Sequence, residues 1–339
     1  MKAHNQKGYI LSLALGIITF CIFISVYVFN RGFTFIRFSQ TITENQKAEQ
    51  LAYGGIQLAM SQLATSALPQ EKAPGKTPPS ANAVLLQTLL PVLNKIQTYQ
   101  LKQTVEGING TLSIVIGSEE GKININQFYD FNKHQFFGQG NPNNDAQLLF
   151  QELFAFIKER TGADLFEEFQ KFLKERKYPL NDVTELLAIK GFEAFKYTVF
   201  YDPFLDSKHE KIYLMDLFTT FSAEKEMQPW LLSESIKQFL KLKDNKTSID
   251  DALKSFKEQS DWKNDWNKSL KLLYGIDYSA LPKIITSLLN STFNPRMFWV
   301  LSNAKVGRAT ARIFAIVERT KETNKDTLPT LIIHKAYIV

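Results

Sequence analysis

An uncharged stretch of 22 residues near the N-terminus constrains this chain more than any other feature. It runs from Tyr9 to Asn30, YILSLALGIITFCIFISVYVFN, behind the short leader MKAHNQKG. As a helix rising 1.5 Å per residue, it is long enough to cross the ~30 Å hydrocarbon core of a bilayer. An Ala-x-Ala-like cleavage site does not follow it, which disfavours an ordinary secretory signal peptide. The sequence therefore predicts a single-pass membrane anchor.

Charge and cysteine usage narrow the class of protein. The net charge is +6, of which residues 1–47 carry +4, with five basic residues and one acid, so the other 292 residues carry only +2. Cationic flanks of this kind suit a membrane end, and the remainder lacks the basic bias of a nucleic-acid binder. The single cysteine, Cys21, lies inside the apolar stretch, so no disulfide or thiolate zinc site is expected in the rest of the chain.

The helical pattern continues beyond the anchor. From Arg31 to Ala67 there is no proline, and apolar residues recur at spacings of three to six. The pattern predicts one helix over 9–67, with 9–30 spanning the membrane and the later part amphipathic. The alternative is a break near Gly32 followed by a separate soluble helix.

The next segments mix turn and strand signals. Residues 69–81 hold four of the twelve prolines and predict a linker. A helix is expected over 82–103. TLSIVIG (111–117) and GKININ (121–126) are rich in β-branched residues and predict a hairpin that turns between Gly117 and Gly121.

A long helical block follows. Asp182 with Glu185 three residues later forms a capping-box pattern, and Gly191 suits the C-cap of that helix. KIYLMDLF (211–218) predicts an isolated strand. Further helices are expected over 146–162, 163–176, 224–242, 248–258, 262–274 and 281–291.

Strand patterns return at 297–307, 308–319 and 331–339. RATARIFAIVER (308–319) alternates small or apolar residues with polar ones, which is typical of a half-buried antiparallel strand. The expected fold class is α+β: a long N-terminal helix packed on an antiparallel sheet, with a large, mostly helical domain inserted between the strands.

Motifs of catalysis are missing from the sequence. There is no HExxH, GxSxG or CxxC, and the P-loop-like segments 117–122 and 75–77 each lack required residues, so both are interpreted as loops. The histidines lack ligand spacing; they are His4, His134, His209 and His334. The sequence predicts that the chain is not an enzyme.

Two weaker signals concern DNA and calcium. LNDVTELLAIKGF (180–192) resembles half of a helix-hairpin-helix unit, but a capped helix and tight turn explain it better. Two acidic clusters could offer oxygen ligands to calcium, although neither has EF-hand spacing and solvated loops are favoured. Their members are Asp202, Asp206, Glu210 and Asp216, and then Asp244, Asn245, Asp250 and Asp251.

The order of these features resembles a known family. A basic leader ending in Gly8, an uncharged helix that becomes amphipathic and a closing sheet resemble type IV pilin-like subunits. Three further stretches are similar, in the same order, to the K-type minor pseudopilin of the type II secretion system. They are EEGKININ (119–126), NDVTELLAIKGF (181–192) and SNAKVGRATARIFAIVER (302–319).

The resemblance implies specific roles near the N-terminus. Prepilin peptidase would cut between Gly8 and Tyr9, and the new amine of Tyr9 would be methylated. Most pilins carry a glutamate at the fifth mature residue, which here is Leu13. That carboxylate neutralises the terminal ammonium of the next subunit toward the tip, so a subunit at the tip itself does not need it.

The resemblance also implies domains, partners and a compartment. Residues 1–8 would be the leader, 68–126 the first part of the pilin-like domain, 127–296 the insert and 297–339 the closing strands. Partners would be I- and J-type minor pseudopilins, the major pseudopilin, prepilin peptidase, the inner-membrane assembly platform and membrane lipid, with no nucleic acid. The chain would sit in the inner membrane, its N-terminus cytoplasmic and its bulk periplasmic, before reaching the pseudopilus tip.

One departure from the family and two alternatives remain. IYLMDLFTT (212–220) carries Asp216 where the family has an Asn-x-Asn-Thr-Ala-like strand, so no calcium ligands are assigned. The first alternative is a minor pilin of a type IV pilus or DNA-uptake system. The second is a membrane-anchored DNA-binding protein of helix-hairpin-helix type, or a membrane-anchored enzyme.

Overall fold

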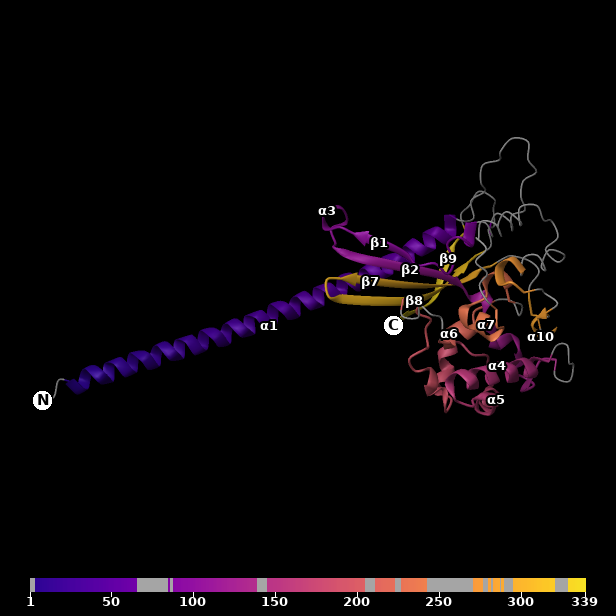
Figure 1. Cartoon of the computed structure of the whole chain (residues 1–339), viewed down its shortest axis with the longest axis horizontal. Helices are drawn as coiled ribbons and strands as arrows, with labels where there is room; N and C mark the ends of the chain where they lie inside the picture. Colours follow the sequence, from indigo (N-terminus) through magenta and orange to yellow (C-terminus); the bar gives the residue numbers. More distant parts are fainter. Residues whose placement is uncertain are drawn as a thin grey trace, which may run out of the picture.

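The structure is a computed structural model in which one helix dominates the shape. Helix α1 (His4–Thr65) runs for 62 residues without a break and projects far beyond the body of the molecule (Figure 1). This confirms the continuous helix and excludes a break near Gly32. Side chains of α1 are described from Leu11 onward. The structure describes residues 4–65, 85, 88–138, 145–204, 211–222, 227–242, 271–276, 280–281, 283–286, 288–289, 295–320 and 329–339.

The second half of α1 packs on a five-stranded antiparallel sheet of order β1-β2-β7-β8-β9. Strands β2 and β7 are hydrogen-bonded neighbours along their whole length, although most of the chain lies between them in sequence. The predicted C-terminal strands are confirmed. The strands are β1 (Gln97–Leu101), β2 (Gly110–Ser118), β7 (Met297–Val306), β8 (Ala309–Arg319) and β9 (Leu331–Ile338).

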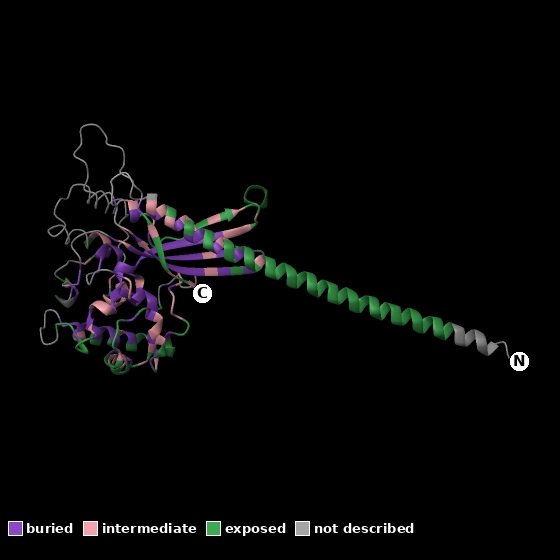
Figure 2. Cartoon of the chain, turned by 180° about the vertical axis from the view of Figure 1, so that it is seen from behind, coloured by how far each residue is buried: buried purple, intermediate pink, exposed green. Residues whose placement is uncertain are grey.

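A stripe of small and apolar side chains joins α1 to the sheet. Its members recur at spacings of three and four, so they share one helix face. Figure 2 shows this buried stripe only where the helix crosses the sheet, whereas the projecting part is exposed. The three alanines let the helix backbone approach the strands closely. The stripe consists of Ala48, Ala52, Ile56, Ala59 and Leu63, all at most 1% exposed.

The residues between β2 and β7 build a second core on the opposite face of the sheet. Its centre is a set of phenylalanine rings, with Phe150 stacked on Phe169 at 5.4 Å between ring centroids. Helices α4 (Ala146–Thr161) and α5 (Phe166–Glu175) confirm two predicted helices. The remaining elements are short.

The short elements between β2 and β7 are η1 (Glu119–Gly121), β3 (Ile123–Asn124), η2 (Ile125–Gln127), β4 (Tyr129–Asp130), β5 (Gln135–Phe136), η3 (Val183–Ala188), η4 (Phe192–Phe195), α6 (Leu214–Leu217), β6 (Phe218–Thr219), η5 (Pro229–Leu231), α7 (Glu234–Phe239) and α10 (Lys283–Thr286).

The central strands of the sheet are thus buried on both faces. Ile114 and Ala315 face α1, whereas Val115 and Phe314 face the second core. The α+β class with a long helix, an antiparallel sheet and further helices between its strands is confirmed.

The helix predicted over 82–103 is wrong from Leu90 onward, where residues 90–94 form turns and an isolated bridge. Residues 97–101 form β1 instead, followed by the short helix α3 (Gln103–Glu106). QTYQL alternates half-buried and exposed residues, which is the period of a strand, and it pairs with β2 along its whole length.

The predicted hairpin of 111–117 with 121–126 is also wrong. Strand β2 pairs with β1 and β7, whereas β3 leaves the sheet and pairs in parallel with β6. The turn η1 redirects the chain because its charged residues are drawn into the protein, where Glu119 is 1% exposed. A hairpin would have left them in solvent.

Three local predictions need further correction. KIYLMDLF is a helical turn, α6, that leads into the two-residue strand β6. The helix starting at Asp182 is a 3₁₀ turn, η3, and Gly191 precedes η4 rather than capping that turn. Of the helix predicted over 224–242, the structure describes residues 227–242, and only η5 and α7 are helical there. The linker 69–81, the helix 248–258 and residues 262–270 lie outside the described residues.

Candidate functional site

The exposed first half of α1 is the most unusual surface of the molecule. Large apolar side chains from Leu11 to Ile42 point outward on every side, and Leu13 is 54% exposed. Within the described chain, α1 is the one helix long and apolar enough to cross a membrane, by length and composition. Such a surface requires cover by lipid or by other apolar helices.

The predicted processing residues lie within this helix. Gly8 and Tyr9 are both in regular α-helix, and Leu13 follows Tyr9 by four residues, which places the two on one side of the helix. Cleavage after Gly8, methylation of Tyr9 and the tip role of Leu13 stay predictions.

Glu44 ties α1 to the sheet, a role that the sequence did not reveal. Its Oε2 accepts a hydrogen bond from the backbone N–H of Arg308 at 3.0 Å, in the turn between β7 and β8. Gly307 in that turn has φ +58°, and a Cβ there would lie 2.6 Å from Oε1 of Glu44. The turn must therefore keep its glycine.

Gly55 sets how closely α1 approaches the sheet. A Cβ at this position would lie 2.8 Å from Cδ1 of Leu112 and closer still to Oγ of Ser302. Gly54, its neighbour, has nothing within 4 Å of the same position. Of the two consecutive glycines, only Gly55 is needed for packing.

The EEGKININ motif forms a buried polar junction where the chain leaves β2. Lys122 and Glu119 form an ion pair with both side chains 1% exposed, and the Lys122 ammonium lies 5.7 Å from the ring centre of Trp299. Glu120 accepts the N–H of Arg296 at 2.9 Å, just where the chain re-enters the sheet at β7. The motif therefore joins the exit and return points of the insert.

The structure separates the two described members of the first acidic cluster. Asp202 pairs with Arg312 of β8, whereas Asp216 is buried and accepts the N–H of Ser235 at 2.7 Å. Burial raises the pKa of Asp216, opposed by the positive charge of Lys122. A solvated loop was therefore the wrong prediction for Asp216.

Calcium ligation finds no support among the residues whose positions are described. No group of three or more His, Cys, Asp or Glu side chains there could hold a metal ion. Asp206, Glu210 and the second acidic cluster (244–251) lie outside the described residues.

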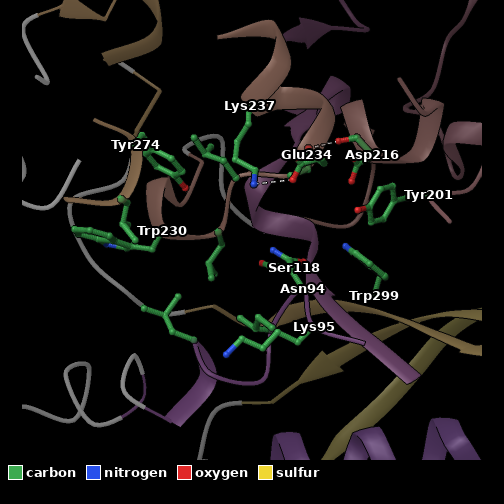
Figure 3. Close-up of a pocket in the computed structure, with 16 residues that line it drawn as sticks. Asn94, Lys95, Ser118, Tyr201, Asp216, Trp230, Glu234, Lys237, Tyr274 and Trp299 are labelled. Atoms are coloured by element: carbon green, nitrogen blue, oxygen red, sulfur yellow. Dashed lines mark hydrogen bonds and ion pairs between the residues drawn. The ribbon is translucent and has the colours of Figure 1, made fainter. Parts of the chain in front are cut away.

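A cavity of about 380 Å³ lies beside this junction, between the end of the sheet and the insert (Figure 3). Asn94 and Ser118 line it from the sheet side, and Glu234 and Lys237, paired at 2.6 Å, line it from α7. Asp216 is the one predicted candidate residue in its wall. The cavity brings together no recognisable catalytic set.

The segment similar to a helix-hairpin-helix unit is occupied by protein contacts. The N–H of Gly191, which would face a phosphate, donates to the Glu193 carboxylate at 2.6 Å. A carboxylate there repels phosphate, which supports the capped-turn interpretation. Of the histidines with described side chains, His134 lies in an exposed turn and His334 pairs with Glu318 at 2.7 Å.

The capping box at Asp182 is confirmed and extended. Asp182 accepts a hydrogen bond from the backbone N–H of Thr184, and Lys335 of β9 pairs with its carboxylate at 2.6 Å. The hydroxyl of Tyr337 donates to the same carboxylate. Burial would raise the pKa of Asp182, but the hydrogen bonds from Lys335, Tyr337 and Thr184 outweigh it and lower that pKa. The insert is thereby fastened to the last strand.

Of the comparisons with known proteins, only the comparison of structures finds a match. No family model matches the sequence, and no curated protein matches it. Among solved structures, the chain is similar to one in the crystal structure of the GspK-GspI-GspJ complex from the enterotoxigenic Escherichia coli type 2 secretion system. The sequences are 14% identical, the TM-score is 0.46, and the match covers 89% of this chain and 99% of that one.

Proposed function

We propose that this chain is a K-type minor pseudopilin at the tip of a type II secretion pseudopilus. The observation that carries the proposal is one uninterrupted helix with two kinds of surface. Its first half is apolar and exposed on all sides, and its second half is packed on an antiparallel sheet. Such a helix can lie in lipid first and among other subunits' helices later.

Before assembly the chain sits in the inner membrane, its N-terminus cytoplasmic and its body periplasmic. After prepilin peptidase cuts behind Gly8, the assembly platform moves the helix into a filament with the major pseudopilin. I- and J-type minor pseudopilins pack beside it. The exposed apolar surface from Leu11 to Ile42 supports this transfer, because it needs an apolar environment at both stages.

The tip position rests on Leu13 and on the insert. A carboxylate at position 13 would serve only if another subunit presented its terminal ammonium above it. The segment between β2 and β7 adds a second core to the sheet end of the molecule, away from the exposed end of α1 (Figure 1). A mass of that size at the head of the helix would block further addition of subunits.

N-terminal sequencing of the mature protein tests the leader. With co-expressed prepilin peptidase, the wild-type chain should begin at Tyr9, and without it the chain should keep its leader. The substitution Gly8→Asp should prevent cleavage. A Gly8→Asp chain that still begins at Tyr9 would contradict the processing site.

A pilus or DNA-uptake role is the alternative with the same helix-and-sheet plan. Deleting this gene should abolish export of folded proteins and leave DNA uptake unchanged. Loss of DNA uptake with intact export would favour the alternative. A DNA-binding role is disfavoured by the Glu193 carboxylate on the N–H of Gly191.

A further inference from the structure

Strand β9 is an edge strand of the sheet, and its outer side has no strand partner among the described residues. Seven of its eight residues pair with β8 on one side, with His334 left out at a β-bulge, and no strand of the described chain lies on the other side. A long edge strand presents a row of backbone donors and acceptors to any neighbouring strand.

The register shows which backbone groups of β9 point outward. The N–H of Val339 donates to the carbonyl of Arg312 at 3.0 Å, so the N–H of residue 339 points toward β8. In an antiparallel pair the bonding direction alternates along the strand. The N–H groups of Ala336 and Ile338 therefore point away from β8.

The side chains of this edge are apolar where an ordinary edge would be charged. Ile338 is 71% exposed and Ile333 is 39% exposed. Both pair with residues of β8 that α1 covers, namely Ile313 and Val317, so they share the helix face of the sheet. With Ala336 they form a strip, called here the β9 strip, that α1 leaves uncovered.

The opposite edge differs in chemistry. In β1, Gln97 and Tyr99 both hydrogen-bond to Gln62 of α1, at 2.8 and 3.1 Å. The side of α1 facing β1 is therefore polar. The other side carries Tyr53, which is 50% exposed and faces toward β9 by helix geometry. Within β1 itself the exposed side chains, Thr98 and Gln100, are polar.

The other face of β9 is already in use by the insert. Lys335 pairs with Asp182 and lies 5.8 Å from the ring centre of Phe221. The insert thus reaches the last strand of the sheet. A second copy of this chain, paired strand to strand at a spacing of about 4.8 Å, would bring two such inserts together.

We infer that β9 receives a strand from a different pilin-like subunit, one that lacks this insert. The partner's strand extends the sheet by hydrogen bonds to Ala336 and Ile338, which a helix or lipid cannot supply. The partner's own long helix, on the same face as α1, then covers the β9 strip. The class of partner rests on the proposed function; the edge rests on the geometry.

Proline at position 336 tests the pairing directly. Ala336→Pro removes an outward N–H and leaves the ladder with β8 intact, whereas Ala336→Ser keeps that N–H. The probes are the I- and J-type minor pseudopilins of the same organism, co-expressed with the full chain and purified in detergent. We expect Ala336→Pro to bind at least one of them about tenfold more weakly than wild type, and Ala336→Ser to bind like wild type.

Cross-linking tests the location. The chain has a single cysteine, so a Cys21→Ser background accepts one new cysteine at a time. Ile338→Cys on β9 should cross-link to the partner, and Gln100→Cys, exposed on β1, should not. Both variants should keep the wild-type unfolding temperature, which separates loss of binding from loss of folding.

The outcomes separate the two proposals. If the wild-type chain binds neither the I-type nor the J-type minor pseudopilin, both the proposed function and the inferred partner are contradicted. If wild type binds but Ala336→Pro has no effect, or if the cross-link forms through position 100, the β9 edge alone is contradicted. Cross-links between two copies through position 338 would overturn the choice of partner.

Discussion

Gly55 shows how one residue sets the distance between a helix and a sheet. A single hydrogen in place of a side chain lets α1 approach Leu112 and Ser302, which any Cβ would push away. The neighbouring Gly54 faces open space and contributes nothing of the kind. Two glycines that look alike in sequence therefore have opposite expected responses to substitution.

We predict that Gly55→Ala lowers the free energy of unfolding by about 1–3 kcal/mol, because overpacking outweighs the better helix propensity of alanine. Gly54→Ala is the matched control and should raise it by up to about 1 kcal/mol. Denaturant unfolding of both variants in detergent, followed by circular dichroism, measures the difference. Equal effects would show that the helix does not approach the sheet this closely.

The contacts of Asp182 lead us to predict that the free energy of unfolding depends on pH. Its pKa is lowered in the folded chain, so its contribution is present above the unfolded pKa of about 4 and disappears as the pH falls through the lower folded value. We expect Asp182→Asn to unfold at a lower temperature than wild type at pH 7. That gap should narrow as the pH approaches 3, and a constant gap would contradict the role of the carboxylate charge.

At the scale of elements, the polar junction after β2 fixes where the insert begins. Glu119 and Lys122 are buried together, so removing one leaves a charge without its counterpart. We predict that Lys122→Met destabilises by about 3–5 kcal/mol and that Glu119→Gln, added to it, recovers much of the loss. Thermal unfolding of the two single variants and the double variant measures the coupling. Additive effects would mean that the pair does not interact.

The same junction explains which elements the sequence could predict. TLSIVIG and RATARIFAIVER carry the apolar alternation of strands, and both are strands. GKININ has the same composition, yet buried Glu119 and Lys122 turn it toward the insert. Nothing local distinguishes a charged turn in solvent from one drawn into a core.

Pairing between separate segments of the chain decided the remaining errors. QTYQL is a strand because β2 lies beside it, and β6 exists through its pairing with β3. The contacts of Glu44 with the β7–β8 turn join residues 264 positions apart, which no local pattern encodes. The long helix, in contrast, was predictable because its apolar run and its stripe are both local.

For the whole molecule, the proposed tip position predicts the effect of restoring the missing carboxylate. Leu13→Glu places an acid on an apolar helix without an ammonium above it, at a cost of about 3 kcal/mol. We expect reduced export of folded proteins, with normal removal of the leader, whereas Leu13→Ile should behave like wild type. Secretion assays in a strain lacking the chromosomal copy measure this. Full export by Leu13→Glu would argue against a tip position.

The uninterrupted course of α1 has a mechanical consequence. Between Arg31 and Glu44, which bonds to the turn between β7 and β8, the helix runs about 20 Å without contact to the sheet. A helix without a break transmits displacement along its axis unchanged. Each movement of the exposed end of α1 along this axis is therefore made equally by the sheet and the insert. The insert is bonded to the sheet through Asp182 and Glu120, and the sheet is packed on α1. The insert would therefore move along the helix axis together with α1.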